Sequence, residues 1–277
     1  MKEFLILFSS VIVFLLLSFC LYLFIIKPGG RRDEMKKYCT LKYAHRGLHD
    51  STRAENSISA FRAAVDQGYA IELDVRLSSD GELVVFHDDT LDRVTKESGR
   101  VDAKSAEELS KIRLLDTDDG IPTFREVLEL VDGKVPLLVE IKEDAGKYGV
   151  TEKTVEMLSA YKGEYVVESF NPLALARVRK LKPRILRGFL SQDFLKERQY
   201  RSLTYFLLQH MLLNVVCRPD FIAFRHSHYK NPALRMVRRI FGTPTLAWTV
   251  QSEADERAAY AHGFDGVIFE QYIPASK

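Results

Sequence analysis

The residues best suited to catalysis gather between Tyr43 and Asp89, in the segments YAHRGLHDSTRAEN, IELDV and LVVFHDD. The candidates in these segments are His45, Arg46, Glu72, Asp74 and His87. Imidazoles transfer protons near neutral pH, carboxylates bind cations, and a guanidinium forms paired hydrogen bonds with phosphate. This combination indicates metal-assisted attack on a phosphodiester.

The spacing within two predicted strands brings three of these residues together. In the strand pattern at 71–77, Glu72 and Asp74 are two positions apart and share a face. The Asp-Gly pair at 80–81 is typical of a two-residue hairpin turn. Such a turn sets Asp74 directly opposite His87 on the returning strand, whereas a register shift of one residue would turn His87 to the other face.

Two further strands extend the predicted cluster. His45 and Arg46 directly follow an apolar run, and Glu140 and Lys142 share a face of a later strand, LLVEIK. With the two acids of the earlier strand, Glu140 makes three carboxylates. Oxygen donors alone suit a hard divalent cation, Mg²⁺ or Ca²⁺, better than Zn²⁺.

At these motifs the chain resembles the glycerophosphodiester phosphodiesterase family. The matching segments are AHRG at 44–47, EN at 55–56, ELDVRLSSDGELVVFHD at 72–88, IPTFREVL at 121–128, LLVEIK at 137–142, ESFN at 168–171 and WTV at 248–250. They occur in family order through nearly everything after the N-terminal segment. The resemblance implies a TIM barrel of the phospholipase-C-like type, a divalent metal, and hydrolysis of glycerophosphodiesters to glycerol 3-phosphate and an alcohol.

The resemblance also implies roles by matching position. The implied roles are metal ligands for Glu72, Asp74 and Glu140, an acid–base pair for His45 and His87, and phosphate contacts for Arg46 and Lys142. Which histidine is the acid stays open. So does the nucleophile, which is either water or the 2-hydroxyl of the glycerol moiety.

Residues at the predicted rim of the site bear on substrate binding. Glu55 is expected to bind a neighbouring side chain or a substrate hydroxyl, and Asn56 to act in the site or to cap the following helix. Trp248, the only tryptophan, is expected in the barrel core or as a wall for the glycerol moiety. His49 and Asp50 lie in the first loop and are expected to be solvated.

Three positions depart from the family pattern, and the second and third concern the same rim. Ala54 stands where the family usually has proline, Gln251 follows WTV in place of the usual asparagine, and Phe269-Glu270 replaces the usual closing Thr-Asp. The loss of the proline loosens the loop without removing a functional group. We expect the changes at Gln251 and Phe269-Glu270 to affect how the alcohol or glycerol moiety is recognised, and therefore the identity of the substrate, rather than the reaction.

The N-terminal segment differs from the rest of the chain. Phe4–Ile26 contains 23 uncharged, mostly apolar residues, enough at 1.5 Å per residue to span a hydrocarbon core of about 30 Å. A signal peptide would have an apolar region of about 7–15 residues and a small-residue cleavage site, which this run lacks. We therefore expect residues 1–27 to be a retained transmembrane helix and the protein to be a single-pass membrane protein.

Residues 28–40 are expected to form a basic linker between this anchor and a domain at 41–277. The basic residues that follow the apolar run are Lys27, Arg31, Arg32, Lys36 and Lys37. Because Lys and Arg concentrate on the cytoplasmic side of membrane helices, the catalytic domain is expected in the cytoplasm. The linker either attracts anionic lipid headgroups or is a solvated tether.

Composition narrows the possible partners. The formal net charge is +2 and no nucleic-acid-binding motif is present, so no nucleic-acid partner is expected. Three scattered cysteines predict neither a disulfide framework nor a thiolate metal site. The sequence indicates no protein partner.

The domain at 41–277 has the length and the alternating pattern of one (β/α)₈ TIM barrel. The predicted strands are Leu41–His45, Ile71–Val75, Leu137–Ile141, Tyr165–Ser169, Ile185–Leu190, Phe221–Phe224, Thr245–Val250 and Gly266–Phe269. Leu83–His87 follows its predecessor too closely for a parallel crossover, so it is expected to be an antiparallel arm in a small hairpin at the barrel mouth. The apolar segment Thr204–Val216 is expected to be an outer helix or a membrane-touching patch beside the mouth.

Three functions remain open at this point. The first is hydrolysis of water-soluble diesters such as glycerophosphocholine. The second is the same reaction on membrane lysophospholipids, as in a lysophospholipase D. The third is a non-catalytic barrel that binds lipid headgroups at the membrane, which the presence of both histidines and all three acids argues against.

Overall fold

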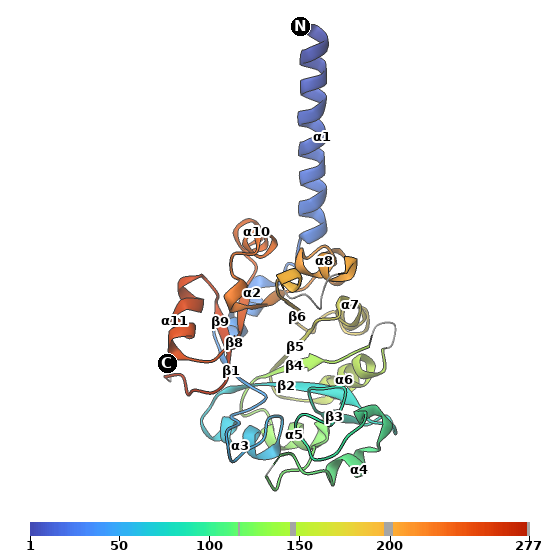
Figure 1. Ribbon diagram of the computed structural model, residues 1–277, viewed down its shortest axis with the longest axis vertical. Helices are drawn as coiled ribbons and strands as arrows, with labels where there is room; N and C mark the ends of the chain where they lie inside the picture. The colour runs from blue at the N-terminus through green and yellow to red at the C-terminus, as the bar shows by residue number, and fades with distance from the viewer. Residues whose placement is uncertain (116, 145–147, 197–201, 276–277) are drawn as a thin grey trace.

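The computed structural model covers residues 1–277 and describes residues 1–115, 117–144, 148–196 and 202–275. Over these residues, eight parallel strands close into a barrel in the order β1-β9-β8-β7-β6-β5-β4-β2, with β1 paired to β2 (Figure 1). The barrel strands are β1 (Lys42–His45), β2 (Ala70–Leu77), β4 (Leu137–Ile141), β5 (Tyr165–Ser169), β6 (Arg187–Ser191), β7 (Phe221–Arg225), β8 (Thr245–Val250) and β9 (Gly266–Phe269). The predicted TIM barrel is confirmed, with every strand within two residues of its expected bounds.

Helices pack around the barrel. The helices of the domain are α3 (Ile58–Asp66), α4 (Ala106–Ser110), α5 (Phe124–Val131), α6 (Gly149–Ala160), α7 (Pro172–Leu181), α8 (Leu203–Gln209), α9 (Asn214–Cys217), α10 (Pro232–Phe241) and α11 (Glu253–Ala261). Several begin at a hydroxyl residue whose side chain accepts a hydrogen bond from a backbone N–H three residues on, as Ser57, Thr123 and Ser252 do.

Strand alternation explains why acids sit inside the barrel. On β2, Ala70, Glu72 and Asp74 face inward, while the intervening apolar residues join the core between strands and helices. On β4, Leu138 faces inward with Glu140 above it toward the carboxyl end. The interior is therefore apolar at the amino ends of these strands and charged at their carboxyl ends.

The hairpin at the barrel mouth has a different register from the predicted one. Strand β3 (Leu83–Val85) pairs antiparallel to β2 as expected, but Leu77 is paired with Leu83, so the predicted register is wrong by one residue. The cause is a three-residue loop, 79–81, closed by a hydrogen bond from the Ser78 N–H to the Glu82 carbonyl oxygen. Gly81 lies in this loop with φ of +80°, a conformation that glycine adopts without steric cost.

Helix α2 (Arg32–Cys39) occupies much of the interval 28–40, which the sequence predicts to be a linker. The buried side chains of its apolar face are Met35, Tyr38 and Cys39. They pack with the inward-facing residues at the amino ends of the strands. A Cβ on Gly266 would lie 2.0 Å from the Cys39 carbonyl oxygen, so this close approach requires glycine. The linker segment therefore closes the base of the barrel instead of forming a free tether.

Helix α1 (Lys2–Ile26) stands apart from the barrel in Figure 1. It is the one helix, among the residues described, that is long and apolar enough to cross a membrane, and a signal sequence has the same features. The barrel binds the carbonyl groups at its end: Asn214 Nδ2 donates to Ile26 O at 2.9 Å, and Arg218 Nη1 donates to Phe24 O at 2.9 Å. The apolar segment at 204–216 forms two short helices, and the second, α9, packs against this end of α1.

Candidate active site

The carboxyl ends of β1, β2 and β4 meet at one rim of the barrel. In the parallel register His45 is paired with Glu72, and Asp74 is paired with Glu140. The carboxylates of Glu72, Asp74 and Glu140 are buried, and one oxygen from each lies within 4.8 Å of the others. The structure therefore brings the predicted acidic cluster together at the end of the barrel where TIM-barrel sites are found.

Three buried carboxylates at this spacing repel one another. Burial and the carboxylates of Asp74 and Glu140 raise the pKa of Glu72 well above its ordinary value. Burial alone would raise the pKa of Asp74 as well, but nearby cations, Lys142 first, hold it well below its ordinary value. The donor set consists of oxygens and carries excess negative charge, so these residues could hold Mg²⁺ or Ca²⁺.

Lys142 lies among these acids as β4 ends. Its Nζ is 2.7 Å from Glu140 Oε1 and 3.0 Å from Asp74 Oδ1. Burial lowers the pKa of Lys142, but Asp74 and Glu140 together raise it by more. The net pKa is therefore above the ordinary value, and the ammonium stays charged. One more acid, Glu168 on β5, is paired with Glu140 in the sheet. Burial and the neighbouring carboxylates raise the pKa of Glu168 well above its ordinary value.

The loop after β1 carries Arg46 and Asn56 in left-handed backbone conformations, with φ of +56° and +55°. Arg46 Nη1 donates to Glu55 Oε1 at 2.6 Å, and its Nε lies 3.4 Å from Asp74 Oδ2. Asn56 Nδ2 donates to the same Asp74 oxygen at 2.8 Å. Ser57, not Asn56, caps α3. The Asn56 amide instead orients Asp74 of the acidic cluster, and Glu55 orients Arg46, the predicted phosphate-binding arginine.

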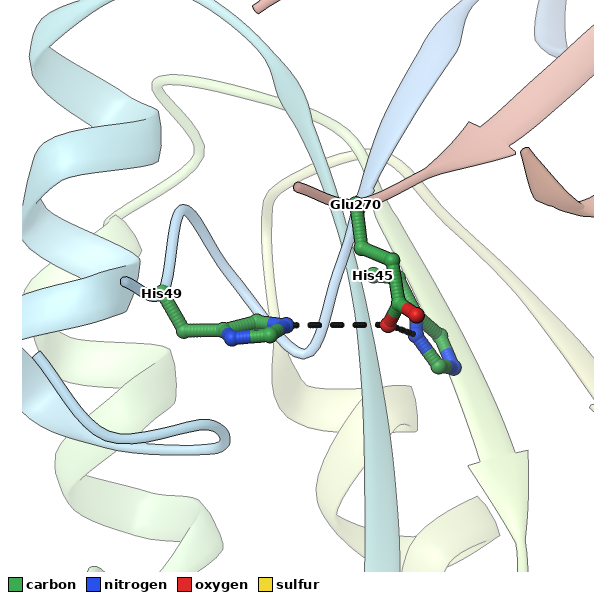
Figure 2. A group of neighbouring side chains, drawn as sticks. All are labelled: His45, His49 and Glu270. Carbon is green, nitrogen blue, oxygen red and sulfur yellow. Dashed lines mark hydrogen bonds and ion pairs between the residues drawn. The ribbon is translucent and has the colours of Figure 1, made fainter. Parts of the chain in front are cut away.

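His45 lies between the acidic cluster and a residue that we assigned to the substrate rim. Its Nδ1 is 2.6 Å from Glu270 Oε2 (Figure 2). Its Nε2 is 3.9 Å from Glu72 Oε2. Gln251 Nε2 donates to the other Glu270 oxygen at 2.6 Å. Burial lowers the pKa of His45, and the hydrogen bond to Glu270 opposes that shift. Burial would raise the pKa of Glu270, but its contacts with His45 and His49 hold it far below its ordinary value.

Glu270, which the sequence places at the substrate rim, also contacts His45, and the sequence analysis did not predict that contact. It follows β9 directly, and β9 pairs with β1, which ends in His45. The adjacency of the first and last strands in a closed barrel was the available signal. His49 was misjudged, because its Nε2 is buried and points toward Glu270 rather than into solvent.

His87 does not lie opposite Asp74 as the predicted register would have placed it. Phe86 stands opposite Asp74, and its N–H donates to the Asp74 carbonyl oxygen at 3.0 Å. Because β3 ends at Val85, strand alternation no longer determines the direction of His87. After Lys142, His87 is among the groups that lower the pKa of Asp74, as expected for a side chain near the acids. His87 Nδ1 is 2.6 Å from Asp88 Oδ1, the same kind of contact as that between His45 and Glu270.

The comparisons with known proteins agree with this geometry. The model of the glycerophosphoryl diester phosphodiesterase family matches residues 45–272. The chain belongs to this family. A glycerophosphodiester phosphodiesterase of Caldanaerobacter subterraneus is 35% identical over 243 residues, which is 83% of this chain and 93% of that protein. A glycerophosphodiester phosphodiesterase of Bacillus subtilis is 25% identical and covers 94% of each chain.

Solved structures support the same family. A phosphodiesterase of Oleispira antarctica, in complex with the product sn-glycerol-3-phosphate, superposes with a TM-score of 0.69 at 26% identity over 85% of this chain and 94% of that one. A glycerophosphodiester phosphodiesterase of Thermotoga maritima gives 0.65 at 27% identity over 83% and 94%. The predictions of the family, the barrel and a phosphoric diester hydrolase are therefore confirmed.

Trp248 lies at the carboxyl end of β8 in this phosphodiesterase. Its ring meets Phe170 edge to face, with centroids 5.6 Å apart, and packs on the interior cluster. The indole is partly exposed, and its Nε1 has no hydrogen-bond partner among the residues described. One edge of the ring therefore packs against the core, and the expectation that Trp248 forms a wall for the glycerol moiety stays a prediction.

Proposed function

We propose that the enzyme hydrolyses water-soluble glycerophosphodiesters to sn-glycerol 3-phosphate and an alcohol, using a divalent cation, Mg²⁺ or Ca²⁺, held by Glu72, Asp74 and Glu140. The observation that carries the proposal is the convergence of three buried carboxylate oxygens within 4.8 Å, at the strand ends of a barrel belonging to this family. When bound, such a cation neutralises phosphate charge and lowers the pKa of the attacking oxygen.

Basic side chains beside the acids would hold the phosphate. Arg46 can offer a guanidinium face and Lys142 an ammonium, and both are already held in place by carboxylates. The glycerol 3-phosphate in the related Oleispira structure supports a site that recognises this half of the substrate. We propose Glu55 as the group that orients Arg46, and Trp248 as a wall for the glycerol moiety.

Two carboxylate–imidazole pairs would carry the protons. In the neutral ring, the contact of His45 Nδ1 with Glu270 Oε2 requires the proton on Nδ1, which leaves the Nε2 lone pair facing the acidic cluster. The contact of His87 Nδ1 with Asp88 orients the second ring in the same way. One imidazole takes a proton from the attacking oxygen, and the other protonates the leaving alkoxide.

The test uses the full-length chain in detergent micelles. We would assay glycerophosphocholine, glycerophosphoethanolamine and a lysophospholipid, each with Mg²⁺, Ca²⁺ or EDTA, and measure glycerol 3-phosphate and lysophosphatidate. The proposal predicts cation-dependent glycerol 3-phosphate from the small diesters. Lysophosphatidate as the sole product would replace the proposed substrate with a membrane lysophospholipid. No turnover by folded protein would remove the proposal.

We also propose that α1 is retained as a membrane anchor and that the barrel faces the cytoplasm. The hydrogen bonds from Asn214 and Arg218 to the end of α1 support retention, because they cap carbonyl groups that a cleaved chain would lose. A basic surface supports the cytoplasmic side. Lys230, Arg235 and Arg239 line a cavity of about 640 Å³, where Gly242 lies against Arg32 of α2.

Intact mass and protease access test this placement. The intact mass of protein extracted from membranes should include α1, and trypsin should digest the barrel in inside-out but not in right-side-out vesicles. A shorter mass would show cleavage of the segment, and digestion in right-side-out vesicles would reverse the topology.

A further inference from the structure

We propose that His45, His49 and Glu270 form a second cation site, for a transition metal such as Zn²⁺, next to the carboxylate site. The three residues come from the end of β1, the loop after it and the end of β9, and both rings point at one carboxylate (Figure 2). The binding claim is independent of the proposed function. Its consequence for turnover rests on the proposed role of His45.

His49 is the observation that the hydrolytic reaction leaves unexplained. Its Nε2 is buried and makes no hydrogen bond with any residue that the structure describes, and its nearest ionic neighbour is Glu270 Oε2 at 3.7 Å. A buried polar atom without a partner is costly, so a ligand that satisfies it is expected. The Glu270–His45 hydrogen bond is enough to orient His45, whereas His49 approaches Glu270 only at the longer distance of 3.7 Å.

The spacing fits a transition metal. In a tetrahedral zinc site, bonds of about 2.0–2.2 Å place neighbouring donor atoms about 3.3 Å apart. His45 Nδ1 is 2.6 Å and His49 Nε2 is 3.7 Å from Glu270 Oε2, so the donor atoms need small shifts to accept the ion. One donor atom from each of the three residues lies within 4.8 Å of the others. Two imidazoles and one carboxylate are the ligands of many open zinc sites.

The surroundings supply support and access. Gln251 Nε2 holds Glu270 Oε1 at 2.6 Å, which leaves Oε2 directed at the histidines. A cavity of about 480 Å³ opens between the loop after β1 and the chain after β9, and its lining includes His49 and Glu270. An ion can therefore reach the site without passing the carboxylates of Glu72, Asp74 and Glu140.

The donor chemistry separates the two sites. Mg²⁺ and Ca²⁺ prefer the oxygen-only set, whereas imidazole nitrogen favours Zn²⁺ and its neighbours in the transition series. Zn²⁺ at His45 Nδ1 displaces the proton from that nitrogen, and the neutral ring then carries its one proton on Nε2. Nε2 loses the lone pair that faces the acidic cluster, so the occupied second site inhibits the enzyme while Mg²⁺ remains in the first.

Binding is tested with full-length, chelator-treated protein in detergent. Co²⁺ is titrated at saturating Mg²⁺ and followed by visible absorption, and Zn²⁺ is then used to displace it. Wild-type protein and Glu140→Gln should show one Co²⁺ that absorbs in the visible region and is displaced by Zn²⁺. Loss of even a supporting contact weakens metal binding by about 10–100-fold, so His49→Ala should lose at least that much affinity. His49→Ala with wild-type Co²⁺ affinity, or no visible absorption in wild type, overturns the proposal.

Inhibition provides a second readout. At saturating Mg²⁺, Zn²⁺ should inhibit wild type, and His49→Ala and His49→Asn should resist Zn²⁺ when each variant is compared with its own activity without Zn²⁺. Circular dichroism and melting curves establish that both variants fold. Equal inhibition of wild type and both folded variants overturns the assignment of the zinc effect to this site. If wild type hydrolyses no diester, the proposed function fails, and the Co²⁺ titration still decides the second site.

Discussion

Replacing Glu270 should lower kcat without unfolding the barrel. Glu270 Oε2 accepts a hydrogen bond from His45 Nδ1 at 2.6 Å, and the two side chains are 15% and 16% exposed. A hydrogen bond to a charged group contributes about 1.5–3 kcal/mol, and a neutral one about 0.5–1.5 kcal/mol. About 1.4 kcal/mol corresponds to tenfold in rate. Glu270→Ala loses the whole charged hydrogen bond and should lower kcat by about 10- to 150-fold. Glu270→Gln keeps a neutral hydrogen bond, so it loses only the difference of about 1–1.5 kcal/mol, and kcat should fall by about 5- to 13-fold.

The assay is release of glycerol 3-phosphate at saturating Mg²⁺, with kcat and KM determined separately and melting curves for each variant. Glu253→Gln is the matched control, because Glu253 is an exposed glutamate of α11 whose ion pair with Arg257 is also exposed. A residue that positions His45 should change kcat and leave KM near the wild-type value. Wild-type kcat within twofold for both Glu270 variants, with the fold intact, would refute the assigned role.

Other consequences are open to direct measurement. His87→Ala should lower kcat by about 10²–10⁴ with little change in Tm, since this side chain is 32% exposed, and near-normal turnover would reject its role. Cys39 and Cys217 should resist iodoacetamide at pH 8 until urea is added, because burial raises the pKa of both thiols and excludes the reagent. Mass spectrometry measures the labelling, and labelled Cys39 in the native protein would contradict the packing of α2. Gly266→Ala should lower the free energy of unfolding by about 1–3 kcal/mol, because its Cβ would meet the Cys39 carbonyl oxygen, and an unchanged urea midpoint would contradict that contact.

The sequence was sufficient for most of the acidic cluster because that part depends on strand periodicity. Glu72, Asp74 and Glu140 share inward-facing positions near the ends of two strands that are neighbours in the barrel. The apolar residues of each strand define which face points inward, and parallel pairing then brings the ends together. The fold follows from the same regular pattern, whereas the reaction class is implied by the resemblance of the motifs to the family.

The remaining features depend on contacts that periodicity does not encode. The Glu270–His45 pair joins residues 225 positions apart and exists only because β9 closes the barrel against β1. The register of β3 depends on whether the loop uses two residues or three, and the Asp-Gly pair is compatible with both. Helix α2 was missed because its charges suggest a solvated tether, while its few apolar side chains decide where it packs.

The central claim is that Glu72, Asp74 and Glu140 hold the cation that turnover requires. The most direct test is glycerol 3-phosphate release from glycerophosphocholine by full-length, chelator-treated protein as Mg²⁺ or Ca²⁺ is added back, for wild type and Glu140→Gln. The account predicts no product in EDTA, recovery with added cation, and a much higher cation requirement for Glu140→Gln. Full activity in EDTA, or the same cation requirement in both proteins, would contradict it.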